Sequence, residues 1–367
     1  MVAVDDSTAR RHARILAVAQ SLGGANPAIV VSLGGLVGAT LAPDPSYVTL
    51  PVSVLQLGVA AGTIPAAWSM VRLGRREAYL CGALFGVAAG CVAALAIVRT
   101  SFALFCLGTL LAGIFQAHVN SYRFAAADTA SVAFRNRAIS WVMLGGIAAA
   151  VIGPQTVIWT RDLIPGAPFA GSFLGQAGLA LLSIPVLATL GRAKPPPATA
   201  GRRGRPLLTI LRQRKFVLAV SAGLVSFGLM SLVMTAAPVA MVVECGLPVD
   251  AAALGIQWHI LGMYVPSLFT GRLIDRFGKE PVTLVGLALI ALAALIGLGG
   301  RDVAHFWVAL VVLGIGWNFG FIGATALVTE CYGPEERARV QAANDFLVFG
   351  TVAMASFGSG ALLSNAG

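Results

Sequence analysis

Long apolar stretches, separated by short polar segments, run through the whole chain. A helix needs about 20 apolar residues to cross the roughly 30 Å hydrocarbon core of a bilayer. The stretches that reach this length are residues 15–42, 47–71, 77–98, 102–124, 137–160, 168–190, 215–243, 249–271, 280–299, 303–328 and 339–363. The pattern therefore predicts an all-α polytopic membrane protein in which eleven spans are visible.

The composition supports the same class. Hydrophobic residues make up 57% of the chain and charged residues only 11%, whereas a soluble domain carries about 25% charged residues. The net charge is +10, but the basic residues form short clusters between apolar stretches rather than one basic face. This distribution argues against a nucleic-acid partner.

The basic residues also predict an orientation. With a cytoplasmic N-terminus, only Arg99, Arg161 and Arg301 of the 25 Lys and Arg residues fall in outer loops. Because Lys and Arg concentrate in cytoplasmic loops, we expect a multi-pass protein of a bacterial inner membrane with its N-terminus in the cytoplasm.

A basic, proline-containing segment divides the chain. Residues 191–215 contain no acidic residue and include a Pro triplet, as expected for a cytoplasmic linker between two bundles. We predict an N-terminal six-helix bundle at 1–190 and a C-terminal bundle at 216–367. Within the linker, Pro206–Lys215 has the pattern of a short amphipathic helix on the membrane surface.

Two motifs recur on either side of this linker. Arg72-Leu73-Gly74-Arg75, after the second span, reappears as Arg276-Phe277-Gly278-Lys279 after the eighth. A second motif follows the fourth span, with Asp128, Arg135 and Arg137, and reappears after the tenth span as Glu330, Arg337 and Arg339. The copies of the first motif are 204 positions apart and those of the second are 202 positions apart. These repeats indicate that the two halves arose by duplication.

The repeated motif resembles the G-x-x-x-D-R-x-G-R/K motif of the major facilitator superfamily, a family of secondary transporters. The second copy matches in full, at Gly271, Asp275, Arg276, Gly278 and Lys279. The first copy has Ala67 and Val71 in place of the Gly and Asp, and it keeps Arg72, Gly74 and Arg75.

The resemblance implies two pseudo-symmetric six-helix bundles and alternating access. It also implies a charged latch at the cytoplasmic side, with Arg75 paired to Asp128 and Lys279 paired to Glu330. Family members have twelve spans, so we expect a twelfth apolar stretch of about 20 residues beyond Gly367.

Polar and aromatic residues at membrane depth are the candidates for substrate binding, since polar groups are costly in a bilayer. Hydrogen bonding between helices is their competing role. Gln116, Asn120 and Arg123 share one helix face. The full set of candidates is Asn26, Gln56, Gln116, Asn120, Arg123, Trp141, Gln257, His259, Trp317, Asn318 and Phe321.

Asp345 is the carboxylate placed well inside a predicted span, and three roles are open for it. It could carry a coupling proton, act as counter-ion for a cationic solute, or pair with Arg72 or Arg75 in place of the Asp missing at Val71. The coupling or gating candidates are Asp345, Arg72, Arg75, Asp128, Asp275, Arg276, Lys279 and Glu330.

These features predict a monomeric secondary active transporter of a small organic solute, coupled to protons. A metabolite or drug exporter is the alternative to a nutrient importer, and a non-transporting receptor or scaffold is the alternative of another class. The chain has no P-loop, HExxH or GxSxG motif, so we expect no enzyme activity and no cofactor or metal. The expected partners are a small-molecule substrate, membrane lipid and protons.

Overall fold

The computed structural model describes residues 6–128, 130–131, 134–191, 204–333 and 335–366. This part of the chain is helical and contains no strand. The first half contains α1 (Ser7–Gly23), α2 (Ala25–Leu41), η1 (Pro45–Tyr47), α3 (Leu50–Leu73), α4 (Arg75–Val98), α5 (Phe102–Asn120), α6 (Tyr122–Asp128), α7 (Arg135–Thr160) and α8 (Ala170–Ala188).

The second half begins with the short helix α9, in the segment where the linker sequence predicts a helix. The helices of this half lie close to the predicted spans. They are α9 (Leu207–Leu211), α10 (Arg214–Val239), η2 (Ala240–Glu244), α11 (Val249–Tyr264), α12 (Ser267–Phe277), α13 (Lys279–Leu298), α14 (Val303–Val328) and α15 (Arg337–Ala366).

Nine helical segments of the described residues are long and apolar enough to cross a membrane. The predicted all-α membrane class is confirmed, although this number is smaller than the eleven spans expected from hydropathy. Two predicted spans, both in the second half, are not among these nine segments. The first is 249–271, which is divided between α11 and α12, and the second is 339–363, which lies in α15.

Three of the predicted spans are interrupted within the described residues. The first is interrupted at Gly24, because Pro27 has no N–H to donate to the carbonyl of Gly23. The fourth is interrupted at Ser121, between α5 and α6. The eighth is interrupted at Val265 and Pro266. Freed backbone groups at such interruptions need partners from other helices.

The two copies of the repeated motif have the same backbone geometry. Gly74 has φ 90° and ψ 161°, and Gly278 has φ 91° and ψ 162°. In each copy one helix ends at the residue before the glycine and the next begins at the residue after it. The duplication read from the sequence is therefore present in the backbone, and both turns use a conformation that favours glycine.

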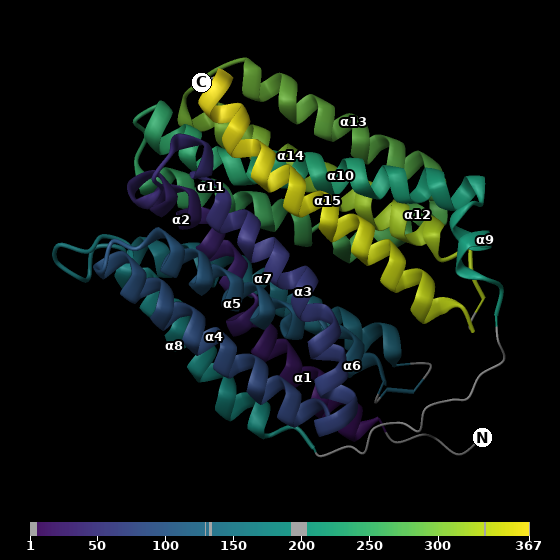
Figure 1. Ribbon diagram of the computed structural model, residues 1–367. Helices are drawn as coiled ribbons and strands as arrows, with labels where there is room; N and C mark the ends of the chain where they lie inside the picture. Colours follow the sequence, from purple (N-terminus) through teal and green to yellow (C-terminus); the bar gives the residue numbers. More distant parts are fainter. Residues whose placement is uncertain (1–5, 129, 132–133, 192–203, 334, 367) are drawn as a thin grey trace.

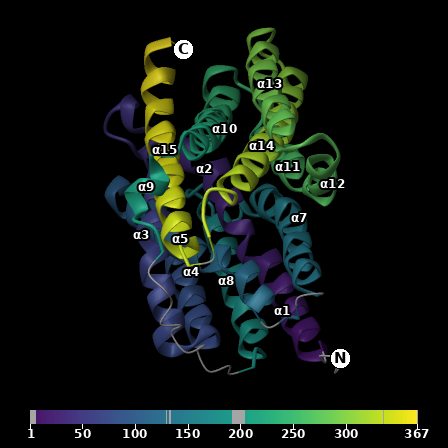
Figure 2. The ribbon, with the colours of Figure 1, turned by 90° about the vertical axis from the view of Figure 1, so that its right-hand side faces the viewer.

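The helices form two bundles that pack side by side (Figure 1). We call the side carrying Gly74 and Gly278 the motif face, and the opposite side, carrying Thr49 and Asp250, the far face. The C-terminal end of α15 lies at the far face, away from α9 and α12 (Figures 1 and 2). Between the bundles, α3 packs on α15, α7 on α11, and α2 on α10.

The conformation of Gly278 gives a test of the repeated turn. A Cβ at this position would meet only ordinary van der Waals contacts, so Gly278→Ala adds backbone strain of about 1–3 kcal/mol without a clash. We expect a lower melting temperature in detergent. Gly297→Ala is the matched control. A Cβ added there would meet no neighbouring atom within 4 Å, and alanine is favoured over glycine within a helix. Equal melting temperatures for the two variants would contradict this account.

Candidate functional site

A cavity of three adjoining chambers lies between the bundles. The central chamber has a volume of about 150 Å³, the aromatic chamber about 400 Å³ and the motif-side chamber about 390 Å³. Asn120 lines all three chambers. The chambers therefore meet around this residue, at the end of α5.

The N-terminal half contributes a row of amides to the cavity, which we call the amide wall. It consists of Gln20 from α1, Gln56 from α3, and Gln116 and Asn120 from α5, all of which line the central chamber. Gln116 donates from Nε2 to Asn120 Oδ1 at 2.9 Å. Gln116 and Asn120 of the predicted shared face are therefore directed at the cavity from α5, and Arg123, the third residue of that face, lines the neighbouring chambers from α6.

The C-terminal half contributes a cluster of rings, which we call the aromatic wall: Phe227, Trp317, Phe321 and Phe349. Trp317 and Phe321 lie one turn apart on α14 and stack, with centroids 5.1 Å apart and ring planes 15° apart. Phe227 lies 5.3 Å from the Trp317 ring, 5.1 Å from the Phe321 ring and 6.0 Å from the Phe349 ring. These rings face the aromatic and central chambers.

Asn26 lies behind the amide wall rather than on it. Its side chain is 2% exposed. Its Nδ2 donates to the carbonyl of Ala112 at 3.1 Å and to Gln116 Oε1 at 3.4 Å, and its Oδ1 accepts from Gln176 Nε2 at 2.8 Å. Asn26 thus fixes Gln116 by connecting α2, α5 and α8.

Gln176 did not emerge as a candidate from the sequence. It lies in the sixth predicted span, from which no candidate was taken. An uncharged amide within an apolar stretch was the available signal.

Asn318 lies beside the aromatic wall but is fully buried. Its Nδ2 donates to the carbonyl of Met263 at 2.6 Å and to Ser267 Oγ at 2.5 Å, and Thr270 Oγ1 donates to its Oδ1 at 2.5 Å. These partners flank the interruption between α11 and α12. Asn318 therefore satisfies the freed backbone of that interruption and holds it against α14.

Three further candidates lie away from the chambers. His259 is buried, and its Nδ1 lies 2.7 Å from the carbonyl oxygen of Leu310. Gln257 accepts a hydrogen bond from Gln155 Nε2 at 3.1 Å, across the two halves. Trp141 lies in a groove on the outer side of α1 and α7. The structure does not bring these side chains to the cavity walls.

Opposite charges from the two halves meet in the motif-side chamber. Arg123 on α6 and Asp345 on α15 both line it, together with Arg75. Asp345 accepts a hydrogen bond from Asn344 Nδ2 at 3.1 Å. The guanidinium of Arg72 instead lies 5.5 Å from the ring centroid of Trp68.

The second copy of the latch contains the ion pair between Lys279 and Glu330, and Lys215 is a further partner of the same carboxylate. Hydrogen bonds from Lys215 and Lys279 lower the pKa of Glu330 to about 2. Asp275 is exposed on α12, and the Arg276 guanidinium lies 5.2 Å from the ring centroid of Phe277. The side chain of Asp128, the predicted partner of Arg75, lies outside the described residues.

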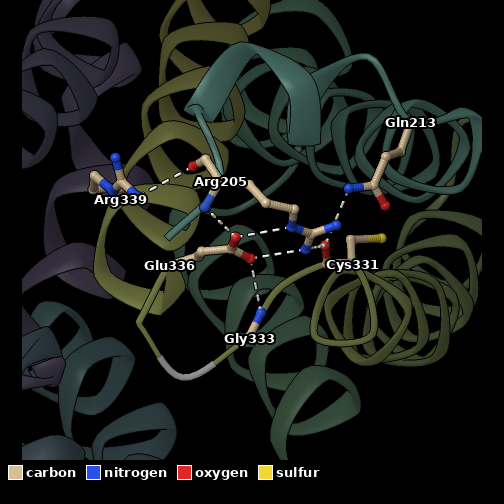
Figure 3. Close-up of polar contacts among 6 residues, drawn as sticks. All are labelled: Arg205, Gln213, Cys331, Gly333, Glu336 and Arg339. Carbon is tan, nitrogen blue, oxygen red and sulfur yellow. Dashed lines mark hydrogen bonds and ion pairs between the residues drawn. The ribbon is translucent and has the colours of Figure 1, made fainter. Parts of the chain in front are cut away.

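A second charged cluster at the motif face was not predicted from the sequence (Figure 3). The backbone N and Nε of Arg205 donate to Glu336 Oε1 at 2.7 and 2.8 Å, and its Nη2 donates to Oε2 at 2.8 Å. Gly333 N also donates to Oε2, at 2.9 Å, and the carbonyl of Cys331 accepts from Arg205 and Gln213. The cluster joins the segment before α9 to the loop between α14 and α15.

At the far face, side chains connect the two halves directly. Thr49 Oγ1 donates to the carbonyl of Ser356 at 3.1 Å, joining the segment before α3 to α15. Arg161 and Asp250 form an ion pair between the end of α7 and the start of α11. These contacts hold the two halves together at the far face, whereas the motif-side chamber reaches Val71 and Arg75 at the opposite face.

A polytopic helical fold with a polar and aromatic cavity between two repeated halves defines a membrane transporter. The sequence matches the family model of the Major Facilitator Superfamily over residues 15–363. The chain belongs to this family, as the repeated motif predicts. It is a secondary transporter of a small solute rather than an enzyme.

The chain is similar to the riboflavin transporter RfnT of Brucella anthropi, with 59% identity over 365 residues that cover 99% of this chain and 92% of the relative. Its fold is similar to that of a mutant of the nucleoside transporter NupG, at 14% identity and a TM-score of 0.74, covering 97% and 91% of the two chains. It is also similar to the xylose transporter XylE from E. coli, at 13% identity and a TM-score of 0.71, covering 96% and 91%.

The Arg205–Glu336 cluster predicts local protection of two backbone amides. Glu336→Ala removes the acceptor of both Arg205 N and Gly333 N, so we expect faster hydrogen exchange in peptides that contain these residues. Glu335→Ala, at an exposed neighbouring carboxylate, is the control and leaves the exchange unchanged. Similar exchange in both variants would count against the cluster.

The same cluster predicts a pH dependence. Hydrogen bonds from Arg205 and Gly333 lower the pKa of Glu336 from 4.5 to about 2. A carboxylate whose pKa is lowered in the folded state stabilises the folded contact at pH values above its pKa in the unfolded state. This stabilisation is lost as the pH falls through the folded-state pKa and the group is protonated. We expect the excess exchange of Glu336→Ala over the wild type to be full above about pH 4.5 and to shrink towards pH 2.

Proposed function

We propose that this chain transports riboflavin across a bacterial inner membrane by alternating access. The observation that carries the proposal is a stacked aromatic wall facing an amide wall, in a chain 59% identical to a riboflavin transporter. The isoalloxazine ring of riboflavin is flat and tricyclic, and its edge carries carbonyl oxygens, ring nitrogens and one N–H. A ring of this kind stacks on Trp317 and Phe321 while amides bond to its edge.

The dimensions and polarity of the cavity support this substrate class. Ligand pockets commonly measure about 300–1,000 Å³ and combine apolar walls with a few polar groups. The aromatic chamber, at about 400 Å³, lies in this range and continues into the central chamber through Gln20, Asn120 and Tyr264. The ribityl hydroxyl groups of riboflavin are donors and acceptors suited to Gln56 and Gln116 of the central chamber.

The motif face is cytoplasmic in this proposal, because the loops at that face carry nearly all Lys and Arg residues. The contacts between the halves at the far face and the chamber that reaches the motif face then correspond to an inward-facing state. Opening to the outside requires the Arg161–Asp250 pair and the Thr49–Ser356 hydrogen bond to separate. The Lys279–Glu330 pair holds the motif turn against the end of α14 during this motion.

Asp345 and Arg123 are the groups we propose for proton coupling. They belong to different halves and line one chamber, so their attraction favours the arrangement in which the halves approach at the motif face. Protonation of Asp345 removes that attraction and changes the balance between the two states. Riboflavin is neutral, which makes a counter-ion role for Asp345 unnecessary.

Flux measurements in proteoliposomes test the proposed function. We expect entry of radiolabelled riboflavin into vesicles that contain the purified chain, and faster entry when the proton gradient is directed inward. Faster entry with an outward proton gradient would instead identify the exporter alternative. An absence of riboflavin flux under either gradient, with folded protein in the vesicles, would exclude the proposed substrate.

The aromatic wall gives a second expectation. Trp317→Ala removes a stacked ring, and aromatic pairs contribute about 0.5–1.5 kcal/mol beyond the area they bury. We therefore expect the apparent Kd for riboflavin to rise about tenfold. Trp159→Ala is the control, since Trp159 is 73% exposed on the outer side of α7. An equal Kd for both variants would place the substrate elsewhere.

Replacement of the proposed coupling carboxylate gives a third expectation. Asp345→Asn keeps the size of the side chain and mimics its protonated form. We expect riboflavin exchange between equal internal and external pools to persist while acceleration by a proton gradient disappears. Glu335→Gln, at an exposed carboxylate outside the cavity, retains both activities. Full proton-driven acceleration in Asp345→Asn would assign coupling to another group.

A further inference from the structure

A groove on the outer side of the N-terminal half is separate from the central cavity. It lies between α1 and α7 and has a volume of about 510 Å³. Its lining shares no residue with the three chambers. The lining residues are Arg14, Ala17, Val18, Ser21, Trp141, Leu144 and Gly145.

The floor of the groove is made by the close approach of the two helices. A Cβ at Gly145 would lie 2.2 Å from the carbonyl oxygen of Ala17, so only glycine allows α7 to lie this close to α1. The sides are apolar and open to the bilayer, since Val18 is 50% exposed and Leu144 is 47% exposed. A slot of this shape fits a hydrocarbon chain.

The end of the groove near the motif face is positively charged. Arg14 lies over Trp141, with Cζ 5.6 Å from the ring centroid, and Arg10 lies over Phe134 at 5.5 Å. Arg10 and Arg14 are one turn apart and therefore share a helix face. Among the described residues, neither guanidinium has a carboxylate within 4.0 Å. Stacking on a ring fixes the guanidinium plane and leaves its N–H edge available to an anion.

We propose that this groove binds an anionic glycerophospholipid. The phosphate group lies between Arg10 and Arg14, where guanidinium groups bind phosphate with charge-assisted hydrogen bonds. One acyl chain lies along Val18 and Leu144 towards the bilayer centre. Trp141, at the level of the headgroups, has the position that indole rings favour in membrane proteins. The site holds α1 against α7 and does not depend on the identity of the transported solute.

Arg11 provides a matched control on the same helix. It is also exposed, but its Nη2 donates to the carbonyl of Thr189 at 3.4 Å, beyond α8 rather than towards the groove. Removal of its charge changes the net charge of the chain as much as removal of Arg10 or Arg14. A difference between these variants therefore reports the groove rather than general attraction to an anionic membrane.

Native mass spectrometry with added phosphatidylglycerol tests the proposal. We expect the wild type and Arg11→Gln to retain one phosphatidylglycerol molecule tightly, and the Arg10→Gln, Arg14→Gln double variant to retain it about thirtyfold more weakly. Each single variant loses about fivefold, which gives a result even if the double variant does not fold. Phosphatidylcholine carries the same phosphate but a choline cation offsets its charge, so its retention changes less between the variants than that of phosphatidylglycerol. Equal phosphatidylglycerol retention by Arg14→Gln and Arg11→Gln would overturn the proposal.

Discussion

The need to satisfy polar groups inside an apolar environment determines the arrangement of the cavity. A bilayer offers no water to buried amides, so each must find a partner in the protein. Asn26 does this by joining α2, α5 and α8, and it thereby directs Gln116 and Asn120 at the cavity. Asn318 does the same for the interruption between α11 and α12. The walls depend on these two buried amides.

The two halves share a backbone plan but have different walls. Gly74 and Gly278 adopt nearly the same dihedral angles, yet the first half presents amides and the second presents stacked rings. A substrate between them has one hydrogen-bonding side and one stacking side. This asymmetry suits a flat molecule with a polar edge, and it explains how a duplicated fold serves one asymmetric solute.

Hydropathy, basic-residue distribution and the repeated motif were sufficient to predict the class, the family and most helix positions. The polar candidates were harder to separate, because sequence spacing does not tell whether an amide faces a cavity or a neighbouring helix. Asn318 and Trp317 are adjacent in sequence, but the first is buried at a helix interruption and the second lines the cavity. Arg205 and Glu336 pair across 131 positions, a separation that local patterns do not report.

The most direct test of the proposed site is a titration of riboflavin fluorescence with the purified wild-type chain in detergent. Flavin emission is quenched when the ring stacks on tryptophan, so binding between Trp317 and the amide wall predicts saturable quenching with one site per chain. Excess lumichrome, which keeps a flat tricyclic ring and lacks the ribityl chain, should compete for the same site and restore the emission of riboflavin. Emission equal to that of riboflavin in empty micelles, with the chain folded, would contradict the account.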